Sequence, residues 1–195
     1  MDFIIATNNK DKVKEIKAIL SGHNVMSQSE AGIHIEAIED GTTFEQNALI
    51  KARSIKKLTD CAIIADDSGI EIDYLGGAPG IYSARYAGVG ATADDCNKKL
   101  LRELEGVPYE KRTGRYVCAM ALILPDGSEH TFLGRCEGYI LDDYRGSNGF
   151  GYDPLFFKPE INMTFGQAPS EVKDKMSHRY LALKELSDFL KEKNI

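Results

Sequence analysis

The sequence lacks the patterns by which secreted, disulfide-stabilised and membrane-spanning chains are recognised. Its four cysteines, Cys61, Cys96, Cys118 and Cys136, are far apart and form no C-x-x-C pair. This spacing favours reduced thiols over a disulfide framework or a zinc site. The first residues, Met1-Asp2-Phe3-Ile4-Ile5, lack the basic segment and the long apolar core of a signal peptide. No apolar run approaches the roughly 20 residues of a transmembrane helix. We therefore expect a cytoplasmic protein with no membrane partner.

An excess of basic charge is also missing. The 24 lysine and arginine residues are outnumbered by 30 aspartate and glutamate residues, which gives a formal net charge of −6. This balance excludes a nonspecific nucleic-acid binder, but local lysines can still hold one small anionic molecule. The chain also lacks internal repeats, linkers and low-complexity segments. Its 195 residues, 43% of them hydrophobic, therefore predict a single domain, residues 1–195, with a sizeable core.

The chain is organised around the segment Ile63-Ile64-Ala65-Asp66-Asp67-Ser68-Gly69-Ile70. The apolar run from Ala62 to Ala65 predicts a strand that is buried on both faces. Because neighbouring strand residues point to opposite faces, Asp66 and Asp67 are expected to play different parts. Ser68-Gly69 predicts a tight turn whose N–H groups face an anion. Acids beside an anion site imply a divalent cation between them, although a solvated Asp-Asp-Ser-Gly turn is the simpler alternative.

A second polar segment, Thr7-Asn8-Asn9-Lys10-Asp11-Lys12, follows the expected first strand, Phe3 to Ala6. Apolar residues come next at helical spacing, namely Val13, Ile16, Ile19 and Leu20. A helix that begins here directs its N–H groups toward an anion, with Lys10 and Lys12 beside them. The glycine-rich signature of a P-loop is absent. An ordinary helix cap with solvated lysines therefore stays open as the alternative.

Between these two segments, His23 to Ile38 predicts a connection and a second strand in which Ile33, Ile35 and Ala37 alternate. An acidic turn follows and contains Glu39, which is either a second metal ligand or a solvated turn residue. Thr43 and Gln46 then fit a capping box at the start of a helix. Apolar residues repeat along one face of that helix: Phe44, Ala48, Ala52 and Ile55.

The rest of the chain predicts short strands, turns and two further helices. Strands and turns are expected at residues 70–74, 76–80, 116–124, 125–127, 131–141 and 155–157. A helix capped by Thr92 is expected to run to Glu105. The last helix is expected to open within residues 170–179, and its inner stripe consists of Leu183, Leu186 and Leu190.

Two segments near the carboxyl end fit the recognition of a flat base. Phe150 lies between Gly149 and Gly151, which leave its ring open to stacking. Ser177-His178-Arg179, with Lys173 four residues before Ser177, groups hydrogen-bond donors. Donors that face a 6-keto oxygen reject adenine, whose amino group leaves them unpaired. The simpler alternatives are a Phe150 that belongs to the core and a solvated helix start at residues 178–179.

Together these strings resemble the inosine triphosphate pyrophosphatase family of house-cleaning purine nucleoside triphosphate pyrophosphatases. The matching strings occur in one order over nearly the whole chain. They are Thr7-x-Asn9-x-x-Lys12, Ala65-Asp66-Asp67-Ser68-Gly69, Leu75-Gly76-Gly77-Ala78-Pro79-Gly80-Ile81-Tyr82-Ser83-Ala84-Arg85-Tyr86, Phe150-Gly151-Tyr152-Asp153-Pro154 and Ser177-His178-Arg179. Several long strings in one order are far more specific than any one of them.

The resemblance implies an α/β fold with a long mixed central β-sheet flanked by helices, two lobes around a central active-site cleft, and a homodimer. It implies magnesium-dependent hydrolysis of inosine, deoxyinosine and xanthosine triphosphates to the monophosphate and pyrophosphate, which keeps these nucleotides out of DNA and RNA. Asp67 would be the proton acceptor and, with Glu39, a magnesium ligand. The substrate would be bound by Thr7, Asn8, Asn9, Lys10, Asp11 and Lys12, by Ser68, by Phe150, Gly151, Tyr152 and Asp153, and by Lys173, His178 and Arg179.

One position departs from the family pattern Thr-Phe-x-Glu-Asn-Ala, which here reads Thr43-Phe44-Glu45-Gln46-Asn47-Ala48. Gln46 can close a capping box but has no charge with which to hold magnesium or its waters. A nucleotide-binding sensor without hydrolysis therefore stays open as an alternative, although Asp67 and Glu39 argue against it. A phosphate-releasing metal phosphohydrolase is a second alternative. Its phospho-aspartate chemistry favours an Asp-x-Asp strand end, whereas the two acids here are adjacent.

Overall fold

The computed structural model describes residues 1–195, apart from the side chain of Asp11. Its strands form a mixed eight-stranded sheet with the order β2-β1-β3-β5-β6-β7-β8, in which β4 also pairs with β3. Strand β1 pairs in parallel with β2 and β3, whereas β7 pairs antiparallel with β6 and β8. The predicted α/β fold, with a central mixed sheet and flanking helices, is confirmed.

The strands are β1 Asp2–Ile5, β2 Asn24–Ser27, β3 Ala62–Ile72, β4 Pro79–Gly80, β5 Thr113–Ile123, β6 Glu129–Ile140, β7 Phe156–Lys158 and β8 Met163–Thr164. The helices are α1 Lys10–Ile19, α2 Phe44–Lys56, α3 Ala93–Glu103, α4 Ser170–Lys173 and α5 His178–Glu192. The chain divides into two compact units. The first unit is Met1–Asp67, Cys118–Gly134 and His178–Ile195, and the second is Ser68–Val117 and Arg135–Ser177. A single domain with two lobes around a cleft stays a prediction.

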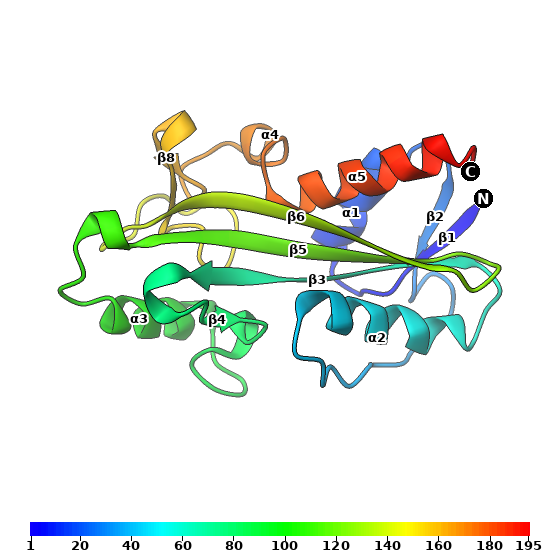
Figure 1. Ribbon diagram of the computed structural model, residues 1–195, viewed down its shortest axis with the longest axis horizontal. Helices are drawn as coiled ribbons and strands as arrows, with labels where there is room; N and C mark the ends of the chain where they lie inside the picture. The colour runs from blue at the N-terminus through cyan, green and yellow to red at the C-terminus, as the bar shows by residue number, and fades with distance from the viewer. The chain divides into compact units, whose positions relative to one another are not determined.

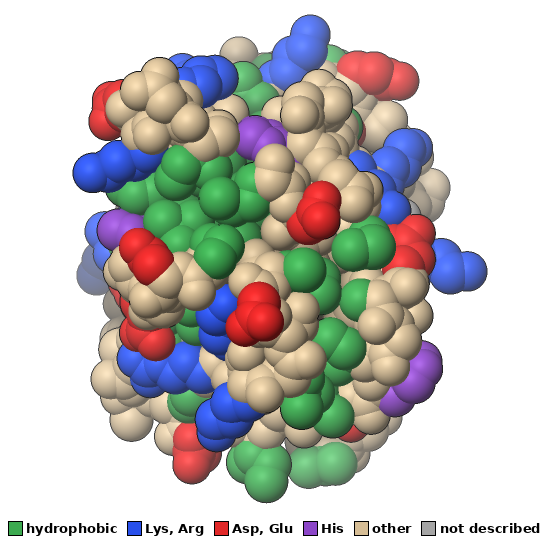
Figure 2. Space-filling view, turned by 90° about the vertical axis from the view of Figure 1, so that its right-hand side faces the viewer, with side chains coloured by type: hydrophobic (Ala, Val, Ile, Leu, Met, Phe, Trp, Pro, Cys, Tyr) green, Lys and Arg blue, Asp and Glu red, His purple; other side chains and the backbone are tan. Residues whose placement is uncertain are grey.

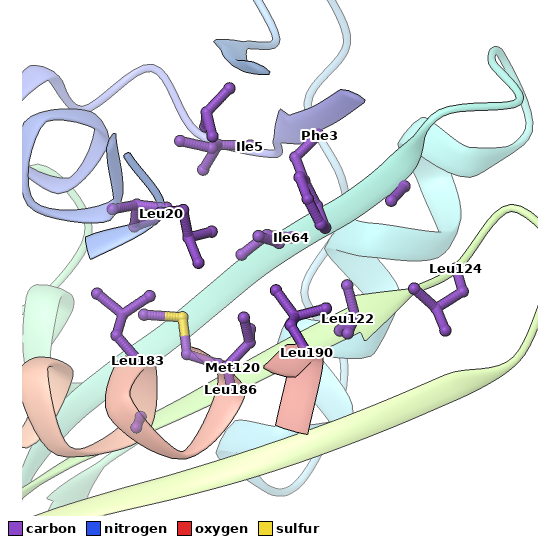
Figure 3. Packing of buried hydrophobic residues seen from close by; sticks show 14 of the residues in the cluster. Phe3, Ile5, Leu20, Ile64, Met120, Leu122, Leu124, Leu183, Leu186 and Leu190 are labelled. Atoms are coloured by element: carbon purple, nitrogen blue, oxygen red, sulfur yellow. The ribbon is translucent and has the colours of Figure 1, made fainter. Parts of the chain in front are cut away.

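In the first unit, helices cover both faces of the strands. Helices α1 and α5 lie on one face, and α2 lies on the other (Figure 1). The inner stripe of α5, Leu183, Leu186 and Leu190, packs in one buried cluster with Ile64 of β3 and Met120 of β5 (Figure 3). Each leucine buried in this way stabilises the unit by roughly 1.5–3 kcal/mol. The predicted inner stripe of the last helix is confirmed.

Helix α2 begins as its sequence predicts. Thr43 is the N-cap, and its side chain accepts a hydrogen bond of 3.2 Å from the Gln46 N–H. This bond satisfies one of the backbone donors that an α-helix leaves unpaired at its first turn. The predicted apolar face is buried and consists of Phe44, Ala48, Ala52 and Ile55. The face with Gln46 and Asn47 is thereby oriented toward the loop that precedes the helix.

The second unit has an aromatic core around the remaining parts of β3, β5 and β6. Tyr116, Phe156 and Phe165 contact one another, with ring centroids 4.7 to 6.1 Å apart. Thr92 caps helix α3 as predicted, and the cap is a full capping box, because Thr92 and Asp95 each bind the other's backbone N–H. Leu100 and Leu104 add to the same core.

Three local predictions were wrong. Ser68-Gly69 is not a turn: β3 continues through it, because Ile70 and Glu71 pair onward with β4. The second strand is Asn24–Ser27 and not residues 33–37, since Val25 pairs with Phe3 and is buried there. The last helix is interrupted by turns at residues 174–177, so α4 and α5 are separate helices. In the first two cases strand pairing with distant residues overrides local propensity.

Glu30, in the loop after β2, is stabilised as a carboxylate. Its Oε2 accepts a hydrogen bond of 2.7 Å from the Ser27 N–H and another of 2.9 Å from Lys17 Nζ. These bonds lower the pKa of Glu30 from 4.5 to about 2. A lowered pKa in the folded state contributes stability above the unfolded-state value, and this stability is lost as the pH falls toward the folded-state value.

We therefore expect the free energy of unfolding of the wild type to exceed that of Glu30→Gln near neutral pH. The difference should shrink as the pH falls from about 5 to about 2.5. Urea titrations of both proteins over this range measure it. A difference that stays constant below about pH 4 would contradict the assignment.

The described surface carries charges of both signs. In the face shown in Figure 2, lysine and arginine side chains alternate with aspartate and glutamate side chains around a group of hydrophobic ones. Cys61, Cys96, Cys118 and Cys136 are free thiols, as predicted. Among the described residues, no helix is both long enough and apolar enough to cross a membrane.

Candidate functional site

Glu39, Asp67 and Lys51 form a charged cluster in the first unit. Glu39 lies on the loop before α2, Lys51 lies on α2, and Asp67 lies in the middle of β3. The Lys51 ammonium is 3.2 Å from Glu39 Oε2 and 3.2 Å from Asp67 Oδ1. The two carboxylate side chains are 33% and 14% exposed, so a ligand at the surface can still reach them. The structure thus brings together the two acids that the sequence predicted as metal ligands.

The cluster shifts the pKa values of its members. Burial raises the pKa of the Asp67 carboxyl above its usual value, and the negative charge of Glu39 raises it further, while Lys51 opposes both. Burial alone would lower the pKa of Lys51. The carboxylates of Asp67, Asp66 and Glu39 outweigh it and raise the pKa of Lys51 above its usual value. Lys51 is therefore a cation at neutral pH, and Asp67 holds a proton more readily than an exposed aspartate does.

The first turn of α2 holds the loop that carries Glu39. Asn47 Oδ1 accepts a hydrogen bond of 2.9 Å from the Gly41 N–H, and Asn47 Nδ2 donates one of 3.2 Å to Asp67 Oδ2. Gln46 Oε1 accepts hydrogen bonds from the N–H of Thr42 at 2.7 Å and from its hydroxyl at 3.0 Å. The predicted capping box is therefore closed by Gln46 on Thr42 and not on Thr43.

Asp66 belongs to a separate, buried row of charges. It is 2% exposed, and its Oδ2 lies 2.8 Å from Lys12 Nζ and 3.5 Å from Arg179 Nε. Arg179 also donates a hydrogen bond of 3.0 Å to Glu15. Burial would raise the pKa of Asp66, but the charges of Lys12 and Arg179 hold it well below its usual value. Asp66 thus lies in a different environment from Asp67, as expected for neighbouring residues on a strand.

The predicted phosphate loop leads from β1 into α1. Asn9 Oδ1 accepts a hydrogen bond of 3.2 Å from the Lys12 N–H, and Thr7 Oγ1 accepts one of 3.2 Å from the Asn9 N–H. Asn8 Oδ1 accepts a hydrogen bond of 2.5 Å from the Ser29 hydroxyl. Two of the N–H groups expected to face an anion are therefore occupied by side chains of the loop itself. Lys10 is exposed, and the side chain of Asp11 lies outside the described residues.

A cavity of about 520 Å³ opens beside this loop within the first unit. Its lining joins the loop to the charged cluster, since it includes Thr7, Asn8, Lys12, Glu39, Lys51 and Asp66. The cavity is large enough for a small polyanion, because pockets of 300–1,000 Å³ are typical for small-molecule ligands.

The donor atoms of the cluster fit magnesium. Glu39 and Asp67 offer carboxylate oxygens, which are the ligands that Mg²⁺ prefers. Among the described residues, no three histidine, cysteine, aspartate or glutamate side chains come together as a metal-binding group. A pair of carboxylates fits Mg²⁺, because this ion is usually held by one or two carboxylates together with substrate phosphates and water.

The second unit displays Phe150 on a loop built around Asp153. Phe150 is 54% exposed, and the Lys173 ammonium lies 4.7 Å from its ring centroid. Lys173 also forms an ion pair with Asp153, which is 2% exposed. Asp153 accepts hydrogen bonds from the Phe150 N–H at 2.8 Å and from the Tyr116 hydroxyl at 3.1 Å. The aromatic ring is thus held in an exposed position by a buried carboxylate.

Of the two glycines beside Phe150, Gly149 is needed for a close approach, whereas Gly151 has open space around it and a φ of +61°. A Cβ on Gly149 would lie 2.1 Å from Asp153 Oδ2, and this residue has a φ of +73°. Gly151 accepts a hydrogen bond of 2.9 Å from Asn97 Nδ2, and the Tyr152 hydroxyl donates one of 2.8 Å to the Ser83 carbonyl. Tyr152 is buried and therefore supports the loop, whereas Phe150 faces solvent.

Most of the predicted site residues lie near other predicted site residues of the same unit. In the first unit, Thr7, Asn8, Lys12 and Glu39 line one cavity, and Asp67 binds Lys51 of the same cavity. In the second unit, the loop of residues 150–153 lies against Lys173. His178 and Arg179 begin α5 and are 5% and 3% exposed, and Ser68 is half-buried on β3. The predicted contacts of all these residues with a substrate stay predictions.

The sequence patterns did not indicate Lys51 and Asn47. These residues are four positions apart on α2, so they share one face of the helix. The sequence offered one signal for them. Each residue directly precedes a buried alanine of the apolar face of α2, Asn47 before Ala48 and Lys51 before Ala52. Both make hydrogen bonds to Asp67.

Comparisons with known proteins identify the family of this chain. Residues 3–189 match the model of the Ham1 family. The chain is 49% identical to a protein of Bacillus licheniformis named dITP/XTP pyrophosphatase, over 97% of each chain. It is 47% identical to the protein of that name from Bacillus subtilis, over 96% of each chain. The solved structure of the Staphylococcus aureus Ham1 protein is similar with a TM-score of 0.93 at 38% identity, covering 99% of this chain and 100% of that one. This chain belongs to the Ham1 family.

Proposed function

We propose that this protein is a house-cleaning pyrophosphatase that hydrolyses inosine, deoxyinosine and xanthosine triphosphates to the monophosphate and pyrophosphate. The observation that carries the proposal is the pair of carboxylates, Glu39 and Asp67, that flanks the Lys51 ammonium. This cluster opens onto the cavity beside the loop of residues 7–12. The identity of 47–49% to proteins named dITP/XTP pyrophosphatase supports the substrate class.

The first unit supplies a proton acceptor and cations for this reaction. A water oxygen attacks the α-phosphorus, and the bond from that phosphorus to the bridging oxygen breaks. The proton of the water passes to the Asp67 carboxylate, and the electron pair of the broken bond leaves with pyrophosphate. Lys10, which is exposed at the start of α1, stabilises the negative charge that develops on the phosphates. Lys51 contributes less charge, because its ammonium is paired with Glu39 and Asp67. Lys12 contributes less charge, because its ammonium is paired with Asp66.

Magnesium is the proposed cofactor, and Glu39 and Asp67 are the residues that would hold it. When bound, it would neutralise phosphate charge and lower the pKa of a bound water. The role of Lys51 in the absence of the ion is to keep the two carboxylates from repelling each other, since it binds both.

Phe150 is proposed to stack on the purine base. Stacking on an aromatic side chain is worth roughly 1–3 kcal/mol per base and tolerates any base. The buried Asp153 and the Lys173 ammonium hold the Phe150 ring in its exposed position. Discrimination between bases is therefore proposed to depend on hydrogen-bond donors, with His178 and Arg179 as the predicted residues.

The contacts of Gln46 weaken the sensor alternative. Its side-chain oxygen accepts two hydrogen bonds from Thr42, so the residue holds the loop after Glu39 without needing a charge. Replacement of the usual glutamate by glutamine therefore leaves the loop anchored. Glu39 and Asp67 both form ion pairs with Lys51. The presence of both acids in one cluster supports hydrolysis over binding alone.

The test is pyrophosphate release from deoxyinosine and xanthosine triphosphates, with and without magnesium, against deoxyadenosine and deoxyguanosine triphosphates. We expect magnesium-dependent release from the first pair and little from the second. Pyrophosphate is detected by a coupled assay, and orthophosphate is measured in parallel. Orthophosphate as the first product would favour the metal phosphohydrolase.

The remaining outcomes separate the other parts of the proposal. Equal release from all four nucleotides would contradict the account of base selection and leave the hydrolase. Nucleotide binding without release would favour the sensor. A homodimer and a cytoplasmic location are also proposed, on the resemblance and on the free thiols respectively.

A further inference from the structure

We propose that Asn47 is a positioning residue that holds the Asp67 carboxylate and the loop of Glu39 at a set separation. The inference rests on the proposed function, because it gives Asn47 a role in the same proposed site. It goes beyond the two acids and the lysine by naming the side chain that ties the loop to the strand.

The amide of Asn47 can make its two hydrogen bonds in one orientation only. The Gly41 N–H is a donor, so it must meet the amide oxygen, and it does so at 2.9 Å. The Asp67 carboxylate is an acceptor, so it must meet the amide NH₂, and it does so at 3.2 Å. Gly41 is two residues after Glu39 in the sequence. One side chain therefore sets where both acids lie.

The packing around Asn47 holds this arrangement firmly. Asn47 is 1% exposed, so its hydrogen bonds are protected from water. The backbone of Gly41 approaches so closely that a Cβ at this position would lie 2.7 Å from Asn47 Oδ1. A side chain at residue 41 would thus displace the amide from its place. Glycine at position 41 therefore leaves the space that the Asn47 amide occupies.

Asn47 and Lys51 bind different oxygens of the Asp67 carboxylate. Oδ2 accepts from Asn47, and Oδ1 accepts from Lys51 at 3.2 Å. The carboxylate is therefore held at both oxygens and cannot rotate freely, while each oxygen keeps a second lone pair for a ligand. Removal of a hydrogen-bond partner from a carboxylate that holds a metal typically costs about 10–100-fold in metal affinity or activity.

Gln46 provides a matched control, because it holds the same loop from the neighbouring position. Its side-chain oxygen accepts from Thr42, the residue after Gly41. Gln46 is exposed, and both of these hydrogen bonds end on the loop. Asn47 differs from it by its second hydrogen bond, to Asp67. A comparison of the two residues separates the anchoring of the loop from the positioning of the carboxylate.

The experiment compares Asn47→Leu with Gln46→Leu. Leucine branches at Cγ as asparagine does but makes no hydrogen bond. With deoxyinosine triphosphate and magnesium, we expect Asn47→Leu to lower kcat about 10–100-fold with KM within about threefold of the wild type. Gln46→Leu removes one anchor of the loop and leaves the Asn47 bond to Gly41 in place, so it should change kcat and KM by no more than about threefold. Equal losses of kcat in the two variants would overturn the proposal, because Asn47 would then act only as a loop anchor.

A second measurement does not need turnover. The affinity for Mn²⁺, which takes the place of Mg²⁺ here, is measured without nucleotide for the wild type and both variants. We expect Asn47→Leu to weaken it about 10-fold and Gln46→Leu, which loses only one anchor of the loop, to weaken it by no more than about threefold. Equal Mn²⁺ affinity in all three proteins would overturn the proposal. If the wild type releases no pyrophosphate, the proposed function fails. The comparison of Mn²⁺ affinities still tests whether Asn47 positions the Asp67 carboxylate.

A third variant covers the case in which Asn47→Leu does not fold. Asn47→Asp keeps an oxygen for the Gly41 N–H but places no donor against Asp67. Thermal unfolding first shows that the protein is folded. We then expect kcat to fall about 10-fold or more with KM little changed. A kcat equal to that of the wild type in the folded variant would overturn the proposal.

Discussion

Replacing Asp67 by asparagine is expected to lower kcat for deoxyinosine triphosphate by about 10²–10⁴-fold, which is the usual contribution of a positioned general base. Asparagine has nearly the same shape as aspartate but cannot accept the proton of the attacking water. The affinity for the nucleotide should stay within about threefold of the wild type, because Lys51 and the loop of residues 7–12 are unchanged. Pyrophosphate release measures the first quantity, and calorimetric titration with the nucleotide measures the second.

Asp126→Asn is the matched control for this variant. Asp126 is exposed on the turn between β5 and β6, where it accepts hydrogen bonds from Ser128. The same chemical change there should leave both turnover and binding unaltered. Near-normal turnover of Asp67→Asn would remove Asp67 as the proton acceptor. A large loss of nucleotide affinity would instead make Asp67 a binding residue.

Replacing Asp66 by asparagine is expected to lower the free energy of unfolding by about 3–5 kcal/mol, as is usual when one partner of a buried ion pair is removed. The side chains of Asp66 and Arg179 are 1% and 4% exposed, so water cannot take the place of Asp66 beside the arginine, which keeps its bond to Glu15. Lys12 loses its partner in the same change. The transition temperature should fall by about 2–4 °C for each kcal/mol. Urea titration and thermal unfolding monitored by circular dichroism measure both.

Glu15→Gln is the control for the buried row of charges. Glu15 binds the same Arg179, but its side chain is 29% exposed, so water replaces much of the interaction. We expect a loss of about 1 kcal/mol or less from this variant. Equal losses from Asp66→Asn and Glu15→Gln would contradict the view that burial makes the Asp66 charge important.

The two adjacent acids illustrate what could be predicted and what could not. Alternation along a strand is a local rule, so the sequence predicted correctly that Asp66 and Asp67 have different environments. The same sequence predicted a turn at Ser68-Gly69, where β3 in fact continues to Ile72. Turn propensity is a local preference, and the pairing of Ile70 and Glu71 with β4 overrides it.

Arg179 shows which side-chain contacts a residue string leaves out. Its place beside His178 in a family string predicted a contact with the base. The structure pairs it with Asp66 and Glu15, which come from β3 and α1. A residue string records which side chains are present but not which distant charge each one meets.

The sequence by itself determined the fold class, the caps of α2 and α3, the inner stripes of α2 and α5, and the family. These depend on local rules, namely apolar periodicity, capping chemistry and ordered strings of residues. Only the tertiary structure decided that Lys51 joins Glu39 to Asp67 and that Asn47 ties the loop of Glu39 to β3. Those contacts join residues 6 to 20 positions apart. Hydrogen bonds over such separations depend on how α2 packs against the sheet, and no local pattern encodes that packing.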